Sequence, residues 1–250
     1  MYVLFLTTEG FAKDAQKISN NFGNLNAYFT LGSNDFFGIS VAGVGDLDGD
    51  SIQDVACGAM YDDDGGSNAG AAYILYLETS GAVKNAVKIS NSYGGFPYFL
   101  ETAEKFGSSL AKLDDLDGDG IVEIAIGAIG CDDGASNSGS IYIVFLHMDG
   151  VVGSAQKISN SAGTLNSYYA LGGGDSFGWA LASLGDLNAD DVCDAVVGSN
   201  GDDSGSENSG AVLVIFLSKH GKVMGGQKIS NLEGRLASFV TLNIDDYFGR

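Results

Sequence analysis

The sequence predicts an all-β fold made of tandem repeats, because two short markers recur with one period and no stretch shows a helical period. The string Lys-Ile-Ser-Asn occurs four times and the pair Phe-Gly recurs at four matching positions, each of these copies 69 or 71 residues after the one before. The string stands at 17–20, 88–91, 157–160 and 228–231, and the pair at 37–38, 106–107, 177–178 and 248–249. Short apolar runs separated by turn residues fill each period, which is typical of strands. The repeat therefore indicates β-sheet units that follow one another along the chain.

Each unit contains four strand-like runs in a fixed order. The first follows the Phe-Gly pair and is rich in small residues, as in GSSLAKL at 107–113. The second and third, EIAIGA at 123–128 and SIYIVFL at 140–146, are almost continuously apolar, as expected when both faces of a strand are covered. The fourth, AQKIS at 155–159, places a lysine between less polar neighbours, the alternation of a half-exposed outer strand. We therefore expect burial to fall from the first strand outward.

This order of runs predicts a β-propeller of four-stranded blades. Sheets packed radially cover each other's faces near the axis and leave the outermost strand in contact with water. A β-sandwich is the structural alternative, but its strands would alternate between polar and apolar residues throughout. The second and third runs do not alternate, so the propeller is favoured.

The repeat markers divide the chain into a single propeller fragment, 1–250, of about three and a half blades. The expected parts are a half-blade at 1–20, blades at 37–91, 106–160 and 177–231, and a stub at 245–250. Propellers usually close with about 4 to 8 blades, so we expect an incomplete arc with exposed apolar faces at both ends. The remaining blades of a longer parent protein are the expected partners of those faces.

Charge excludes two classes of partner. The chain has 12 basic and 32 acidic residues, a net charge of −20, which repels the phosphates of nucleic acids and of anionic membranes. The apolar runs are far shorter than the ~20 residues of a membrane-spanning helix, so membrane insertion is not expected. Cys57, Cys131 and Cys193 match no zinc-binding spacing and are interpreted as free thiols. The partners that such acidity favours are cations.

Three acidic nine-residue segments between the first and second runs carry the candidate chemistry. They read DLDGDSIQD at 46–54, DLDGDGIVE at 115–123 and DLNADDVCD at 186–194. Side-chain oxygens at positions 1, 3, 5 and 9 and the carbonyl oxygen of position 7 suit Ca²⁺, which binds about six to eight oxygens. The candidate ligands are Asp46, Asp48, Asp50, Ile52, Asp54, Asp115, Asp117, Asp119, Ile121, Glu123, Asp186, Asn188, Asp190, Val192 and Asp194. We therefore expect two or three Ca²⁺ ions.

A calcium-binding hairpin has two alternatives, of which the first is disfavoured by the residues at position 12. An EF-hand begins with the same spacing but needs a glutamate at position 12 and a helix after it; position 12 is Cys57, Ile126 or Val197, inside a predicted strand. A solvated acidic turn without metal is the second alternative. It applies most to the third segment, where Asn188 replaces an aspartate and Ala189 replaces the glycine that the turn prefers.

Together these features resemble the FG-GAP repeats of integrin alpha-subunit propellers and of related microbial surface proteins. The resemblance rests on the Phe-Gly pairs, the acidic segments, the Gly-Ala pairs at 58–59 and 127–128, and Gly198, whereas the family's proline after Gly-Ala is missing everywhere. It implies a propeller, usually of seven blades, that binds Ca²⁺ in hairpins on one face. It further implies macromolecular ligands bound through loops on the opposite face.

Catalysis finds little support, because His147 and His220 occupy different positions within the repeat and form no shared constellation; we expect no enzyme.

A second acidic cluster at 61–68, 130–137 and 201–208 is interpreted as a solubilising turn, with an extra cation site as the alternative. The segments between blades contain aromatic residues that are interpreted as packing between blades, with an exposed recognition surface as the alternative. These residues are Tyr28, Phe29, Tyr98, Phe99, Tyr168 and Tyr169.

The leading functional hypothesis is a calcium-binding propeller module for extracellular binding or cell adhesion, part of a larger surface or secreted protein. Its ligand would be a protein or a carbohydrate, bound on the loop face opposite the calcium hairpins. Two alternatives stay open: a carbohydrate-binding propeller, lectin-like or lyase-associated, and a structural spacer. An extracellular or cell-surface location follows from the resemblance and from the abundance of Ca²⁺ outside cells.

Overall fold

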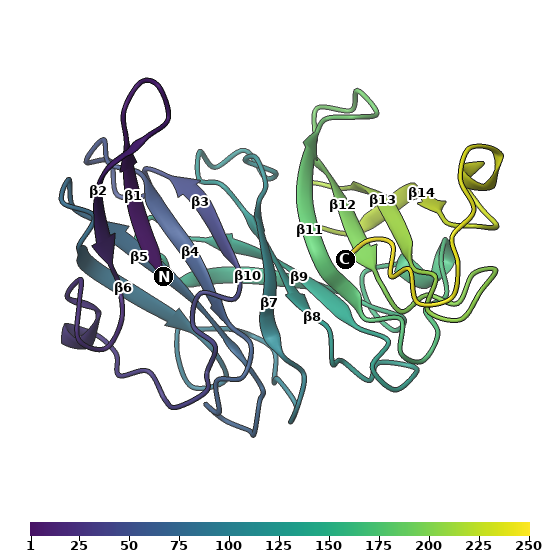
Figure 1. The fold of residues 1–250 in the computed structure, drawn as a ribbon, viewed down its shortest axis with the longest axis horizontal. Coiled ribbons are helices and arrows are strands. Elements are labelled where there is room, and N and C mark those ends of the chain that lie inside the picture. The colour runs from purple at the N-terminus through teal and green to yellow at the C-terminus, as the bar shows by residue number, and fades with distance from the viewer.

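The computed structural model describes residues 1–250 and consists of three four-stranded antiparallel sheets and one two-stranded sheet (Figure 1). The two-stranded sheet pairs β1 (Tyr2–Leu6) with β2 (Ala12–Lys17). The first full sheet contains β3 (Val41–Gly45), β4 (Asp54–Ala59), β5 (Ala71–Leu77) and β6 (Val83–Ile89). The second contains β7 (Phe106–Lys112), β8 (Ile124–Ala128), β9 (Ser140–Leu146) and β10 (Val152–Ile158). The third contains β11 (Phe177–Gly185), β12 (Asp194–Ser199), β13 (Ala211–Leu217) and β14 (Val223–Ile229).

The only helices are short 3-10 turns between sheets: η1 (Leu25–Ala27), η2 (Leu165–Ser167) and η3 (Leu236–Ser238). None of them has the length and apolar character needed to span a membrane. Within each full sheet every strand pairs with its neighbours in sequence, so each sheet is an antiparallel meander. Figure 1 shows the sheets following one another from β1–β2 to β11–β14 in an open arc. The predicted all-β blades are confirmed.

An apolar core lies between each pair of neighbouring sheets. Ile74 on β5 and Ile126 on β8 belong to the core between the first and second full sheets. Ile143 on β9 and Leu213 on β13 belong to the core between the second and third. Because each core is built from two sheets, blade stacking and not any single blade supplies the buried apolar surface.

The expectation that burial falls from the first strand outward was wrong. All seven residues of β5 and of β9 are buried, whereas Val41 on β3 is 54% exposed. The first strands lie side by side, and β7 contacts both β3 and β11 (Figure 1). A first strand is therefore buried where a neighbouring blade covers each of its faces, as for β7, and half exposed where one face lacks that cover, as for β3 and β11.

The Phe-Gly and Gly-Ala markers meet at the contact between successive blades. A Cβ atom added to Gly58 would lie 2.0 Å from the carbonyl oxygen of Gly107 in the next blade. That same oxygen accepts a hydrogen bond from Ser40 Oγ at 2.7 Å. Gly107 itself has a φ of +87°, which L side chains rarely adopt. The two glycine columns are thus required because neighbouring backbones touch there.

The lysine of the Lys-Ile-Ser-Asn marker is a buried counter-ion, which corrects two interpretations made above. Lys88 is only 9% exposed, and its Nζ lies 2.9 Å from both Asp62 Oδ2 and Asp64 Oδ2. Asp62 also accepts a hydrogen bond from the Tyr73 hydroxyl at 2.9 Å. The fourth strand is therefore not simply half exposed at its lysine. The second acidic cluster is not merely a solubilising turn, because two of its carboxylates hold this lysine.

The same network recurs in the other blades with different side chains. Lys157 Nζ lies 3.4 Å from Glu104 Oε1 and 3.1 Å from Asp133 Oδ2, and Lys228 Nζ lies 2.5 Å from Asp202 Oδ2. Burial disfavours the charged form of Lys157, but the Glu104 and Asp133 carboxylates outweigh it, and the pKa of Lys157 is raised. In the three full blades the marker therefore ties the outer strand to the loop before the third strand.

The asparagine of the marker fixes the segment between blades. Asn91 Nδ2 donates to the carbonyl oxygen of Leu100 at 2.7 Å, and Asn91 Oδ1 accepts from the Leu100 N–H at 2.6 Å. The same pair of bonds links Asn160 to Leu171. Since both the nitrogen and the oxygen of the asparagine side chain are bonded to the segment, the segment leaves each blade along one defined path.

Candidate metal site

The three acidic segments form hairpin loops that occupy the same position in each blade. They join β3 to β4, β7 to β8 and β11 to β12. Position 12 of each segment, Cys57, Ile126 or Val197, lies in the strand that follows. This placement excludes the EF-hand alternative, in which a helix follows the loop.

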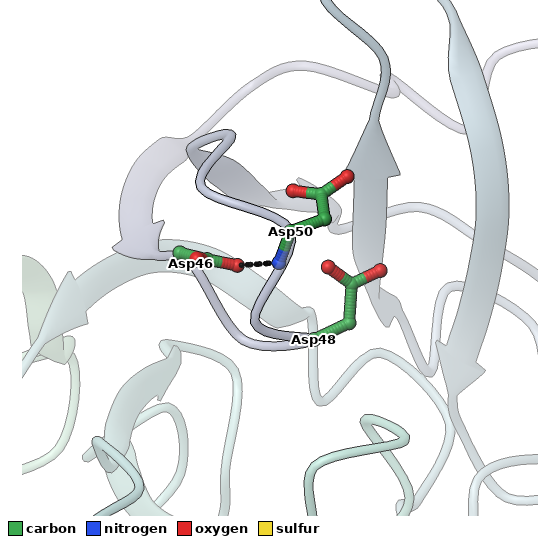
Figure 2. Close-up of side chains that lie close together, drawn as sticks. All are labelled: Asp46, Asp48 and Asp50. Atoms are coloured by element: carbon green, nitrogen blue, oxygen red, sulfur yellow. Dashed lines mark hydrogen bonds between the residues drawn. The ribbon is translucent and has the colours of Figure 1, made fainter.

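The first aspartate shapes each loop. Asp46 Oδ1 accepts hydrogen bonds from the N–H groups of Gly49 at 2.8 Å and Asp50 at 3.0 Å, the second of which is drawn in Figure 2. Asp115 accepts three such bonds in the second loop, and Asp186 accepts two in the third. A carboxylate bonded to successive N–H groups folds the chain around itself.

This fold brings carboxylates together in two of the three loops. Asp46, Asp48 and Asp50 each place an oxygen within 4.8 Å of the others, and Figure 2 shows the three side chains around one point. The second loop gathers a corresponding group within the same limit, made of Asp115, Asp117 and Glu123. In the third loop no such group forms, and the Asn188 amide donates a hydrogen bond to Asp190 Oδ2 at 3.0 Å.

The ninth position is an aspartate with the same hydrogen bonds in the first and third loops, and a glutamate in the second. Asp54 is buried, and its two oxygens accept from the N–H groups of Leu47 at 2.9 Å and Leu77 at 3.0 Å. Asp194 makes the equivalent bonds in the third loop. These aspartates thus tie the start of the loop to its end and to the third strand.

Glu123 is the longer residue at the ninth position of the second loop. One oxygen accepts from the Leu116 N–H at 2.5 Å, and the side chain also reaches Asp115 and Asp117. Burial raises the pKa of Glu123 to about 7, and the neighbouring Asp117 and Asp115 carboxylates act in the same direction. Burial likewise raises the pKa of Asp54 and of Asp194. Crowded and buried carboxylates of this kind are stabilised by a bound cation.

The fifth and seventh positions are linked through the backbone. The N–H groups of Ile52, Ile121 and Val192 donate to the carboxylates of Asp50, Asp119 and Asp190 at 2.8, 2.7 and 2.9 Å. Each fifth-position carboxylate is thereby oriented by the residue two positions later. The apolar side chains at the seventh position offer no ligand, so only their carbonyl groups suit a cation.

A lysine that the sequence analysis did not single out lies at the first loop. Lys84, on β6, forms ion pairs with Asp48, at 2.8 Å between Nζ and Oδ2, and with Asp50. These two carboxylates raise the pKa of Lys84. The signal in the sequence is slight: a lysine stands where the second and third blades have Gly153 and Met224. An ammonium group held by the oxygens shows that this cluster attracts a cation, and an all-oxygen donor set fits a hard one.

The aromatic residues between blades pack on the outer strand of the following blade. The hydroxyl groups of Tyr28, Tyr98 and Tyr168 donate to the carbonyl oxygens of Lys84, Ala155 and Met224. The packing interpretation holds for the half-buried Tyr28 and Tyr98, whereas 47% of Tyr168 is exposed. Phe99 differs, because 74% of it is exposed.

Fold and loops together define a class: β-propeller blades that carry an acidic loop in their first hairpin. A family model for the FG-GAP repeat matches residues 37–75 and 106–144, the first three strands of the first two full blades. The first two full blades are thus FG-GAP repeats. The third blade has the same strand order but lies outside both matches, and it is the blade whose acidic loop departs from the pattern.

Similar proteins agree with this assignment. The chain is 32% identical to integrin alpha-E of Homo sapiens over 137 residues, which are 53% of this chain and 10% of that protein. It is 30% identical to integrin alpha-PS2 of Drosophila melanogaster over 201 residues, 78% of this chain and 12% of that protein. It is 26% identical to phosphatidylinositol-glycan-specific phospholipase D of Bos taurus over 174 residues, 68% of this chain and 19% of that protein. The aligned part is therefore a small share of each relative.

Proposed function

We propose that the chain is a calcium-binding β-propeller module for extracellular binding or cell adhesion. The observation that carries the proposal is the convergence of three carboxylates in each of two loops. Each loop joins two strands of a packed blade, so the ligands are presented by a rigid scaffold. Oxygen ligands alone favour a hard cation, and a loop of this size with several carboxylates suits Ca²⁺.

The proposed sites use the nine-residue pattern. In the first loop the ligands would be Asp46, Asp48, Asp50, the carbonyl of Ile52 and Asp54. In the second they would be Asp115, Asp117, Asp119, the carbonyl of Ile121 and Glu123. The third loop, with Asp186, Asn188, Asp190, the carbonyl of Val192 and Asp194, would bind more weakly. Its asparagine brings one charge fewer, and charge count sets the affinity of calcium loops.

The likeness to integrin alpha subunits supports an adhesion-type role at the cell surface. A protein ligand bound through the loops opposite the acidic hairpins is the proposed partner. We propose no catalytic role, since His147 and His220 lie in turns of two different blades. The proposed organisation is one propeller unit, 1–250, with a half-blade at 1–20, blades at 37–91, 106–160 and 177–231, and a further first strand beginning at 245–250.

Calcium titration by calorimetry, together with a thermal melt, tests the metal sites. We expect binding at two strong loops and a higher Tm with Ca²⁺, because a ligand that binds only the folded state stabilises it. At a hundredfold excess over Kd each site adds about 2.7 kcal/mol, which raises Tm by about 5 to 10 °C for a domain of this size.

Asp117→Ala should remove one site without unfolding the protein. The matched control is Asp114→Ala, an exposed aspartate directly before the second loop that takes part in no carboxylate group; both sites should survive in it. Absence of binding heat at millimolar Ca²⁺ in a folded sample would defeat the metal assignment.

A further inference from the structure

Lys84 occupies a bulge that directs it toward the first acidic loop. In the β5–β6 pairing, Leu77 lies opposite Val83 and Tyr76 lies opposite Asn85, so Lys84 is an extra residue without a partner. Such a bulge turns the extra side chain away from the regular alternation of the strand. Here the ammonium group reaches Asp48 and Asp50 across the end of the same blade.

The bulge recurs in every hairpin of this type, but its residue varies. In the second and third blades it holds Gly153 and Met224, which carry no charge. In the β1–β2 hairpin it holds Lys13, which forms no ion pair. The bulge is thus part of the scaffold, whereas a lysine paired with an acidic loop is peculiar to the first full blade.

We propose that Lys84 is a built-in competitor for the cation of the first acidic loop. It would neutralise Asp48 and Asp50 in the metal-free protein, and it would have to leave before both carboxylates can turn to a divalent ion. The first loop would then bind Ca²⁺ more weakly than the second, whose three carboxylates face no lysine. This inference rests on the proposed calcium function.

The backbone around Lys84 makes the competition persistent. The carbonyl oxygen of Lys84 accepts a hydrogen bond from the Tyr28 hydroxyl, and the carbonyl oxygen of Val83 accepts one from Asn24 Nδ2 at 2.9 Å. Both donors come from the segment that precedes the blade. Because the backbone is fixed, the ammonium group stays within reach of the loop after displacement and acts at a high effective concentration.

The decisive experiment measures the first loop alone. In an Asp117→Ala, Asp190→Ala background the first loop is the only intact site, and its Ca²⁺ affinity is measured by calorimetry with Lys84, with Lys84→Met and with Lys84→Gln. Both substitutions should tighten binding by about five- to tenfold, the effect of removing two exposed ion pairs. Lys84→Met should also lower the Tm in chelator, because the carboxylates then repel each other unrelieved. The control Lys13→Met, the same change at the same kind of bulge, should alter neither quantity.

Two results separate failure of the inference from failure of the proposed function. If the otherwise unmodified chain binds Ca²⁺ at the second loop while Lys84→Met and Lys84→Gln leave the first loop unchanged or weaker, the competitor role is overturned and the calcium function stands. If the unmodified chain binds no Ca²⁺ at all, the proposed function fails and the competitor role fails with it.

Discussion

The second and third full blades share one scaffold but differ in the polar groups that it carries. In both, the first aspartate of the acidic loop accepts hydrogen bonds from the N–H groups four and five residues later. Of these two loops, only that of the second blade gathers three carboxylates. The shape of the loop is therefore set by its first position and survives without the remaining ligands. A hairpin of this shape is not by itself evidence for a metal.

The buried lysine networks of these two blades differ in the same way. In the second blade Glu104 accepts from the Tyr142 hydroxyl at 2.6 Å and pairs with Lys157, which also pairs with Asp133. In the third blade leucine replaces the tyrosine, at position 213, and Lys228 pairs with a single carboxylate. The second blade thus has the more complete network, so substitution of its lysine should cost more stability than substitution of the lysine in the third blade.

The largest effect is expected from Lys157→Met. The substitution leaves Glu104 buried without its counter-ion, and breaking a buried pair in this way costs about 3–5 kcal/mol. Lys228→Met should cost less, because one ion pair is lost instead of two. Urea denaturation at pH 7 in chelator measures both. Exposed Lys222→Met is the control and should stay within about 0.5 kcal/mol of the parent protein; equal losses for Lys157→Met and Lys228→Met would contradict the comparison.

The next effect separates loop shape from metal binding. In chelator, Asp115→Ala and Asp186→Ala should each lower the free energy of unfolding by about 1 kcal/mol, because both lose hydrogen bonds to backbone N–H groups. With Ca²⁺ at a hundredfold excess over Kd, Asp115→Ala should also lose the stabilisation of about 2.7 kcal/mol from the second site. Asp186→Ala should keep the stabilisation that the second site provides. Thermal melts with and without Ca²⁺ provide the measurement, and a calcium response that Asp186→Ala abolished instead would reverse the assignment of the two loops.

Most of the fold could be predicted from the sequence because the same markers and runs repeat with one period. The Phe-Gly spacing, the apolar second and third runs and the position of the acidic segments predicted blades that the structure has. The pairing of Lys88 with Asp62 was missed, since a contact between residues 26 positions apart is visible only when the strands are aligned in space. Lys84 was missed for a related reason, because a bulge cannot be read from apolar alternation. The burial of the first strands was misjudged because it depends on which faces neighbouring blades cover.

A smaller effect concerns pH in the third blade. Burial raises the pKa of Asp175 to about 6, and the nearby Asp202 carboxylate adds to the rise. The folded state therefore holds this proton more tightly than the unfolded state, whose ordinary value is 3.8. Stability from this group is fully present below about pH 4 and is lost as pH rises to about 6.

Asp175→Asn should remove this loss of stability at high pH, because asparagine does not ionise. It should raise the free energy of unfolding by about 1–2 kcal/mol at pH 7.5 and change it little at pH 4. Urea denaturation across this pH range measures the difference, with the exposed Glu207→Gln as the control that should show no such dependence. A variant that is less stable than the parent protein at pH 7.5 would show that the Asp175 carboxylate is needed as an anion.

The smallest effect sharpens the comparison of the two loops at one backbone position. Ala189 has a φ of +62° where the second loop has Gly118 at +86°. A left-handed conformation costs an alanine about 1–2 kcal/mol, and part of this cost is offset because glycine loses more conformational freedom on folding. Ala189→Gly should therefore stabilise the protein by about 0.5–1 kcal/mol, and the reciprocal Gly118→Ala should destabilise it by a similar amount. Both are measured by urea denaturation in chelator. Since neither residue offers a side-chain oxygen, Ala189→Gly should not by itself create calcium binding in the third loop; binding gained there would mean that backbone strain, and not the missing carboxylate at Asn188, separates the two loops.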